Sequence, residues 1–151
     1  DVLGRDACLV LAHVRELPRD ARRVADRPQP VAGAAHSIDA SKTVDRIIGV
    51  FPKNEEKVIR TRVAQSFRFI ASQRLIPLAD GKGRVAAIEI LKSTMRTREY
   101  IEKGESEGKS LTDAMEQGDQ DGMQTFDTVI ENFIRDGVVS IDLEIPFGRD
   151  P

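Results

Sequence analysis

One residue, His36, has both the chemical type and the surroundings of a functional group. It directly precedes the polar stretch SIDASKT (37–43), which leads into an apolar helical pattern. An imidazole titrates near neutral pH and can move protons in a site, but in such a turn it can equally be a capping or exposed side chain. Local sequence leaves both interpretations open.

Other patterns that could do chemistry are incomplete. Cys8 has no recognisable base partner, no serine lies in a G-x-S-x-G elbow, and no metal-ligand spacing such as H-E-x-x-H occurs, so we predict no metal site. Gly81-Lys82-Gly83 lacks the phosphate-binding pattern G-x-x-x-x-G-K-[ST] and a following helix, which favours a hairpin turn. The stretch DQDG (119–122) opens like a calcium loop without its remaining ligands, so we predict a polar turn between helices.

The composition is that of one globular domain. Apolar residues make up 40% of the 151 residues and charged residues 32%; 23 basic against 25 acidic side chains leave a net charge of −2. No basic excess is available for a phosphate backbone, so we expect no nucleic-acid partner. The single cysteine excludes an internal disulfide, the longest apolar run (7–12) is too short to span a bilayer, and no signal-peptide pattern opens the chain. We therefore expect a cytoplasmic setting.

Composition changes abruptly near residue 36. Residues 1–35 contain six Arg and seven Ala but no Lys, Ile or Phe, whereas residues 36–151 contain seven Lys, thirteen Ile and all six Phe. A natural domain seldom abandons three common residue types for so long. Beyond one apolar stretch (7–14), residues 1–35 give no clear structural pattern.

From residue 37 onward, apolar periodicity predicts helices and one hairpin. The predicted helices cover about 44–51, 54–72, 95–103, 111–117 and 123–136, and the hairpin covers about 74–91 with its turn at 80–83. Asn54, Thr94 and Ser110, the last with Asp113, are the expected helix caps, and Gly104 and Gly118 the expected ends.

Three further features of these elements follow from the sequence. Pro77 has no N–H and places the first strand at a sheet edge. Arginines 60, 62, 68 and 74 are interpreted as a solvated or subunit-facing surface, and residues 138–145 as a strand or a frayed tail.

Four stretches together resemble one protein family. HSIDASKTVDRIIGVFP (36–52) is similar to the segment that follows the His box of secretion-type ATPases, the hexameric RecA-like motors of type IV pili and type II secretion. The stretches at 72–77, 83–91 and 122–127, which read SQRLIP, GRVAAIEIL and GMQTFD, resemble the pilus-retraction branch, the PilT family. Their order and spacing match over about residues 36–139. The resemblance implies an α/β fold: the C-terminal part of a RecA-like P-loop ATPase domain, rich in helix, with an antiparallel edge hairpin at about 74–91. A RecA-like sheet also has central parallel strands that this sequence does not supply, so the apolar faces of the helices at 54–72 and 123–136 are expected to lack part of their packing surface.

The retraction branch carries an A-I-R-N-L-I-R-E motif after this hairpin, and the chain has a divergent version of it. The equivalent stretch is RTREYIEK (96–103), in which Arg98 and Ile101 match the first arginine and the second isoleucine of the motif. Tyr100 replaces a leucine, and Glu102 stands where the second arginine would be. By resemblance, Arg98 and Ile101 are the retraction-motif residues of this chain.

The chain departs from the family in its nucleotide-binding elements. No Walker A pattern occurs, residues 1–35 show no Walker B region, and the family's L-H-T is altered to Ala35-His36-Ser37. By resemblance, His36 is the His-box residue that approaches the terminal phosphate. We hypothesise that residues 1–35 are an out-of-frame reading of the Walker B region, because a permitted codon choice for 26–36, read one base later, encodes a family-like segment.

The resemblance implies a fragment of a hexameric ATPase that powers type IV pilus retraction, with the Walker A loop missing. The intact family protein uses ATP and Mg²⁺, whereas this chain alone is expected to hold no cofactor and to be inactive. The implied partners are further copies of the chain and an inner-membrane platform protein, at the cytoplasmic base of the pilus. The alternative is a catalytically inactive interaction module derived from a type II or type IV secretion ATPase.

Overall fold

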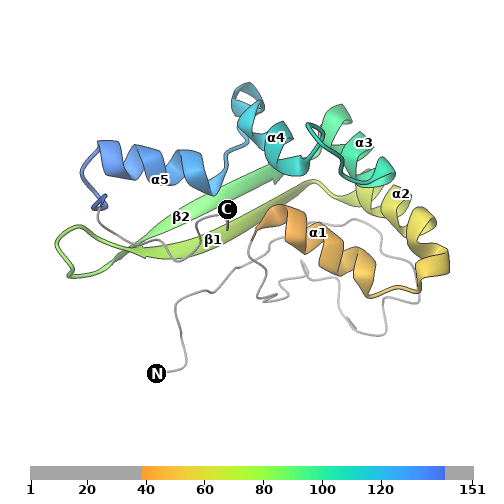
Figure 1. Cartoon of the computed structure of the whole chain (residues 1–151), viewed down its shortest axis with the longest axis horizontal. Helices are drawn as coiled ribbons and strands as arrows, with labels where there is room; N and C mark the ends of the chain where they lie inside the picture. Colours follow the sequence, from red (N-terminus) through yellow and green to blue (C-terminus); the bar gives the residue numbers. More distant parts are fainter. Residues whose placement is uncertain (1–38, 142–151) are drawn as a thin grey trace.

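A computed structural model describes residues 39–141, in which helices pack against one β-hairpin (Figure 1). In chain order the elements are α1 (Ala40–Gly49), the 3₁₀ turn η2 (Lys53–Glu55), α2 (Glu56–Ser66), β1 (Phe69–Pro77), β2 (Arg84–Lys92), α3 (Met95–Lys103), α4 (Leu111–Glu116), the 3₁₀ turn η3 (Asp119–Asp121) and α5 (Phe126–Arg135). Residues 1–38, including His36 and the segment hypothesised to be out of frame, lie outside the described residues.

The predicted hairpin is confirmed. β1 and β2 pair in antiparallel register from Phe69 opposite Lys92 to Pro77 opposite Arg84. The turn contains Gly81 at φ +70°, a backbone conformation that glycine adopts without steric cost. Within the described residues these two strands are the whole sheet, and β1 begins five residues before the predicted start.

The prediction of a helix over 54–72 is wrong at both ends. Asn54 lies inside η2 and caps nothing, and α2 ends at Ser66 because Phe67 takes an extended conformation (φ −71°, ψ 148°). Ile70, which the pattern placed on the helix, instead pairs with Leu91 in the hairpin and is 1% exposed. Ile70 is β-branched, a side-chain type that fits a pleated sheet, and the strand buries it.

The starts of α3 and α4 were predicted correctly, whereas α5 begins at Phe126, three residues after its predicted start. Thr94 and Ser110 each accept a hydrogen bond from the backbone N–H three residues on and form complete capping boxes. α3 spans 95–103 as predicted and ends at Gly104, whose φ is +83°. The DQDG stretch forms η3, the expected polar turn.

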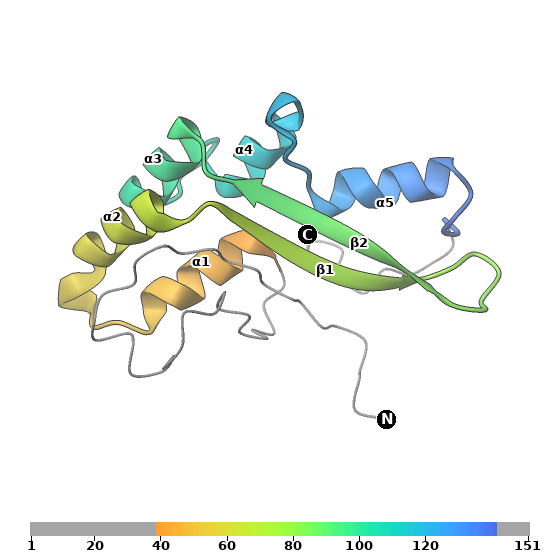
Figure 2. The ribbon, with the colours of Figure 1, turned by 180° about the vertical axis from the view of Figure 1, so that it is seen from behind.

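The helices pack against opposite ends of the hairpin. The larger cluster joins α1, α2, α3 and α4 to Ile70 and Leu91, whereas the smaller one joins α5 to Ile76 and Ala87 nearer the turn. Figure 1 shows α2 and α3 gathered at one end and α5 lying beside β2 toward the turn, and Figure 2 shows the same arrangement from behind. Arg74 on β1 also reaches α5, with its guanidinium carbon 4.1 Å from the centre of the Phe126 ring.

Exposed apolar side chains lie on the hairpin and also elsewhere among the described residues, at Val50, Val58, Met95 and Ile141. The predicted gap in packing on the helices at 54–72 and 123–136 is wrong, because Ile59, Val63, Val129 and Ile130 are all buried. Alternation along the strands instead directs three large apolar side chains to the opposite face, where Phe69, Leu75 and Ile88 are 38–41% exposed. Residues 138–141 form no strand, and 142–145 lie outside the described residues. Across the described range, no helix combines the length and the apolar character needed to cross a membrane.

Gly118, between α4 and η3, has no room for a methyl group. A Cβ atom at this position would lie 2.8 Å from the Ala114 carbonyl oxygen and would overlap the Met123 side chain. We expect Gly118→Ala to lower the free energy of unfolding by about 1–3 kcal/mol, measured by urea denaturation. The control is Gly49→Ala, which meets nothing within 4 Å and should be neutral or mildly stabilising. An equal loss in both variants would contradict the packing argument.

Candidate functional site

The described chain begins three residues after His36, at the start of α1. Asp39 is the N-cap of this helix: its Oδ1 accepts the Lys42 N–H at 2.7 Å, and its carbonyl oxygen accepts the Thr43 hydroxyl at 2.9 Å. An aspartate at this position satisfies amides that have no partner within the helix. The polar stretch after His36 therefore fixes where α1 begins.

A second carboxyl group, on the hairpin, holds the same helix start. Oε1 of Glu89 on β2 accepts the backbone N–H of Ala40 at 2.8 Å, across 49 residues of sequence. Glu89 is 4% exposed and Ala40 is completely buried, and Glu89 is the one buried carboxyl group among the described residues. The contact ties α1 to β2 through a bond that solvent does not reach.

The environment of Glu89 makes it titratable near neutral pH. Burial raises its pKa from 4.5 to about 7, and the Ala40 hydrogen bond opposes part of this rise. Asp39 and Asp127 raise the pKa further, whereas the positive charge of Arg74 lowers it. Protonated and ionised forms of Glu89 are therefore both populated at neutral pH.

Ser72 lies beside Glu89 on the same face of the hairpin. The two residues are directly opposite in the strand register, which places their Cβ atoms about 4.5–5.5 Å apart. Ser72 is completely buried, and its Oγ has no hydrogen-bond partner within the described part of the chain. A buried hydroxyl without a hydrogen-bond partner lowers the stability of the fold, because it has lost its hydrogen bonds to water and gained none in return.

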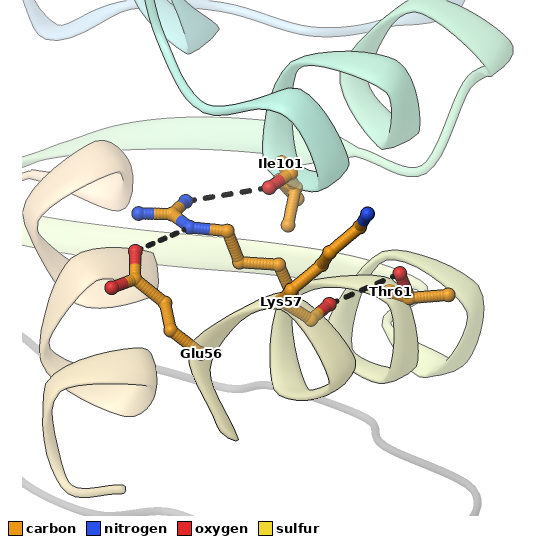
Figure 3. A network of polar contacts seen from close by, with 5 residues as sticks. Glu56, Lys57, Thr61 and Ile101 are labelled. Carbon is orange, nitrogen blue, oxygen red and sulfur yellow. Dashed lines mark hydrogen bonds and ion pairs between the residues drawn. The ribbon is translucent and has the colours of Figure 1, made fainter. Parts of the chain in front are cut away.

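The joint between α2 and α3 carries the second polar feature. Arg60 on α2 donates from Nε to Glu56 Oε1 at 2.8 Å and from Nη1 to the carbonyl oxygen of Ile101 at 3.3 Å (Figure 3). Ile101 is near the end of α3, where carbonyl groups have no partner within the helix. Arg60 therefore caps α3 from a neighbouring helix, and its positive charge suits that helix end.

Loss of this cap should weaken the docking of α3. We expect Arg60→Met, which keeps the apolar stem and removes the guanidinium, to lower the free energy of unfolding by about 1–2 kcal/mol in urea denaturation. Arg62→Met is the control, since Arg62 is exposed on the same helix. Losses of the same size in both variants would rule out a specific role for the Arg60 contacts.

The two predicted motif residues occupy different environments. Ile101 is 1% exposed and belongs to the larger core cluster. Arg98 is exposed, and its Nε donates to the Ser93 hydroxyl at 2.9 Å. Met95, one turn earlier on the same helix, is 87% exposed. Of the predicted pair, Arg98 is thus available to a partner, whereas Ile101 holds α3 in place.

Comparison with known proteins identifies the relatives of this chain. A comparison with protein-family models gave no match. A twitching motility protein of Neisseria gonorrhoeae is 36% identical over 110 residues, which cover 73% of this chain and 29% of that protein. The type IV pilus retraction ATPase PilT of Pseudomonas aeruginosa is 33% identical over 134 residues, which cover 87% of this chain and 38% of that protein.

A solved structure agrees with these matches. The crystal structure of the pilus retraction motor PilT with bound ADP superimposes with a TM-score of 0.61 and 26% identity, covering 78% of this chain and 32% of that one. The chain belongs to the PilT family. The resemblance found in the sequence and the α/β fold that it implied are both confirmed. The chain spans about a third of the length of the curated PilT-type relatives that it matches.

Sequence reasoning missed three residues of the site in this PilT relative. The sequence assigns Arg60, with the other arginines, to a solvated or subunit-facing surface, but its side chain is half-buried between α2 and α3. Ser72 and Glu89 lie in two of the stretches that resemble the PilT family, but the sequence alone assigns no role to either residue. A signal for Glu89 exists, because the two-residue period places it on the inward face between Ala87 and Leu91. No sequence pattern points to Ala40 as its partner.

Proposed function

We propose that this chain works as the C-terminal part of a PilT-type ATPase that powers type IV pilus retraction. The supporting observation is the similarity in sequence and in fold to PilT over more than three-quarters of the chain. In this proposal the chain contributes His36, contacts between subunits of a homohexamer and the α3 helix with Arg98. The motor acts at the cytoplasmic side of the inner membrane, on a platform protein of the pilus.

Nucleotide chemistry in this proposal depends on residues that the printed sequence does not contain. The intact motor would bind ATP with Mg²⁺, and a P-loop backbone and its lysine would hold the phosphates. The sequence has no G-x-x-x-x-G-K-[ST] pattern. The 151-residue chain by itself should therefore neither bind nor hydrolyse ATP.

The second candidate function is a catalytically inactive interaction module that docks on an intact motor or its partner. The missing P-loop pattern favours it for the 151-residue chain on its own. Calorimetry with ATP and Mg²⁺ tests the shared expectation, since micromolar binding by this chain would contradict both candidates. A chimera that joins the upstream part of Pseudomonas PilT to residues 36–151 separates them, because only the motor proposal predicts that it hydrolyses ATP.

Arg98 should affect retraction more than hydrolysis. It is exposed on α3, and by resemblance this helix follows the catalytic part of the motor. We expect Arg98→Ala in the chimera to reduce twitching at least several-fold while ATP hydrolysis stays within about twofold, measured on agar and with purified protein. The matched control is Arg96→Ala, which removes another exposed arginine on α3. Normal twitching by Arg98→Ala would mean that this divergent motif has lost its role.

A further inference from the structure

The contact between Glu89 and Ala40 is a buried polar link between α1 and the hairpin, beside the apolar packing that also joins them. α1 follows the segment that carries His36, and β2 belongs to the hairpin. The N-terminal end of a helix has free amide donors, and Glu89 takes the first of those in α1. The Glu89 side chain, which accepts this hydrogen bond, is buried and lies on a paired strand. It is therefore held more rigidly than a side chain on a loop.

We infer that Glu89 is a positioning residue, which fixes the start of α1 to the hairpin, with Ser72 as the buried donor available to its ionised form. The Ser72 hydroxyl is the unused polar group across the strand pair. A small rotation of this side chain, or one buried water, would satisfy both groups. Only the effect on hydrolysis rests on the proposed function; the contact itself does not.

Charged groups from three packed elements act on this position. Asp39 at the start of α1 and Asp127 on α5 are negative and favour the protonated carboxyl group, whereas Arg74 on β1 favours the ionised form. From α4, the buried side chains of the same cluster are Leu111 and Met115, which do not titrate. The strength of the hydrogen bond from the Ala40 amide therefore depends on pH. As pH rises, the neutral carboxyl group of Glu89 becomes a carboxylate, which binds the amide more strongly.

The direct test is NMR of the 151-residue chain without nucleotide. The Ala40 amide shift should titrate with a midpoint near 7, and Glu89→Gln, which keeps an acceptor oxygen, should abolish the titration but preserve slow hydrogen exchange at Ala40. Glu89→Leu should speed that exchange by about tenfold or more, since a lost hydrogen bond is worth about that factor. Ser72→Ala should raise the midpoint, because the ionised carboxyl group loses a donor.

Controls and contrary results are equally specific. Glu116→Gln, an exposed change on α4, should leave the Ala40 titration and exchange as in the unmodified chain. A flat Ala40 shift between pH 5 and 9, or a titration that persists in Glu89→Gln, would overturn the assignment of Glu89. Should Glu89→Leu fail to fold, the Glu89→Gln titration still decides, and an unchanged midpoint in Ser72→Ala would remove Ser72 from the contact.

The consequence for the motor is measured separately in the chimera with Pseudomonas PilT. Glu89→Gln should flatten the pH profile of kcat near neutral pH, and Glu89→Leu should lower kcat by about tenfold with little change in KM for ATP. An inactive chimera whose Ala40 amide behaves as expected would refute the motor proposal and leave the positioning contact standing. An active chimera whose pH profile does not change in Glu89→Gln would refute the effect of Glu89 on hydrolysis.

Discussion

Replacing His36 by alanine in the chimera with Pseudomonas PilT is expected to slow ATP hydrolysis by about 10²-fold or more. By resemblance, this side chain approaches the terminal phosphate, and a donor aimed at charge that develops during phosphoryl transfer commonly contributes a factor of this size. The measurement is kcat from phosphate release at saturating ATP and Mg²⁺. The affinity for ATP should change little, because the P-loop carries most of the binding.

A surface variant of the same chimera controls for damage to the fold. Lys57→Ala alters an exposed side chain at the start of α2 and should keep full activity. If His36→Ala retains hydrolysis within about threefold, the His-box assignment fails. The Arg98→Ala variant supplies the opposite pattern, with hydrolysis kept and retraction lost, so the two substitutions separate chemistry from its mechanical use.

Glu89 should make the stability of the chain fall as pH rises toward neutrality. Its pKa is about 7 when buried and 4.5 as the ordinary value, so between these values the folded chain binds a proton that the unfolded chain has lost. The unfolding free energy then decreases with rising pH, and the loss is complete above pH 7. One pKa unit corresponds to about 1.4 kcal/mol, which makes the full effect about 3 kcal/mol.

Urea denaturation of the unmodified chain and of Glu89→Gln between pH 4.5 and 8 measures this effect. The amide does not titrate, so the difference in stability between the two proteins should change by about 3 kcal/mol over the range and level off above pH 7. Glu116→Gln, whose side chain is exposed, should run parallel to the unmodified chain. If the unfolding free energies of Glu89→Gln and of the unmodified chain instead change with pH in parallel, Glu89 has the same pKa in the folded and unfolded states.

Local signals in the sequence predicted the elements whose ends are fixed by nearby residues. α3 has its predicted bounds because Thr94 caps one end and Gly104 ends the other, both within one turn of the helix. The hairpin was found from its glycine-containing turn. The junction at 67–72 was mispredicted because Phe67 and Ile70 have helical spacing, and the pairing partner that decides the matter, Leu91, is 21 residues further along the chain.

The candidate site depends more on contacts that are distant in sequence. Arg60 looks like any exposed helix arginine until α3 is placed beside α2, which brings the Ile101 carbonyl oxygen to its guanidinium. Glu89 can be suspected from strand alternation, but its hydrogen bond to Ala40 spans 49 residues. His36 and residues 1–35 lie outside the described residues, so the His-box assignment and the reading-frame hypothesis stay predictions. The nucleotide sequence of the gene tests the reading-frame hypothesis.

ATP hydrolysis by the purified chimera of Pseudomonas PilT with residues 36–151 tests the central proposal most directly. Joined to an intact P-loop, this chain should form a working motor that hydrolyses ATP within about tenfold of Pseudomonas PilT, while a chimera with its P-loop lysine replaced stays inactive. A folded chimera that binds ATP yet hydrolyses it no faster than the lysine variant would contradict the proposal that this chain is the C-terminal part of a pilus retraction ATPase.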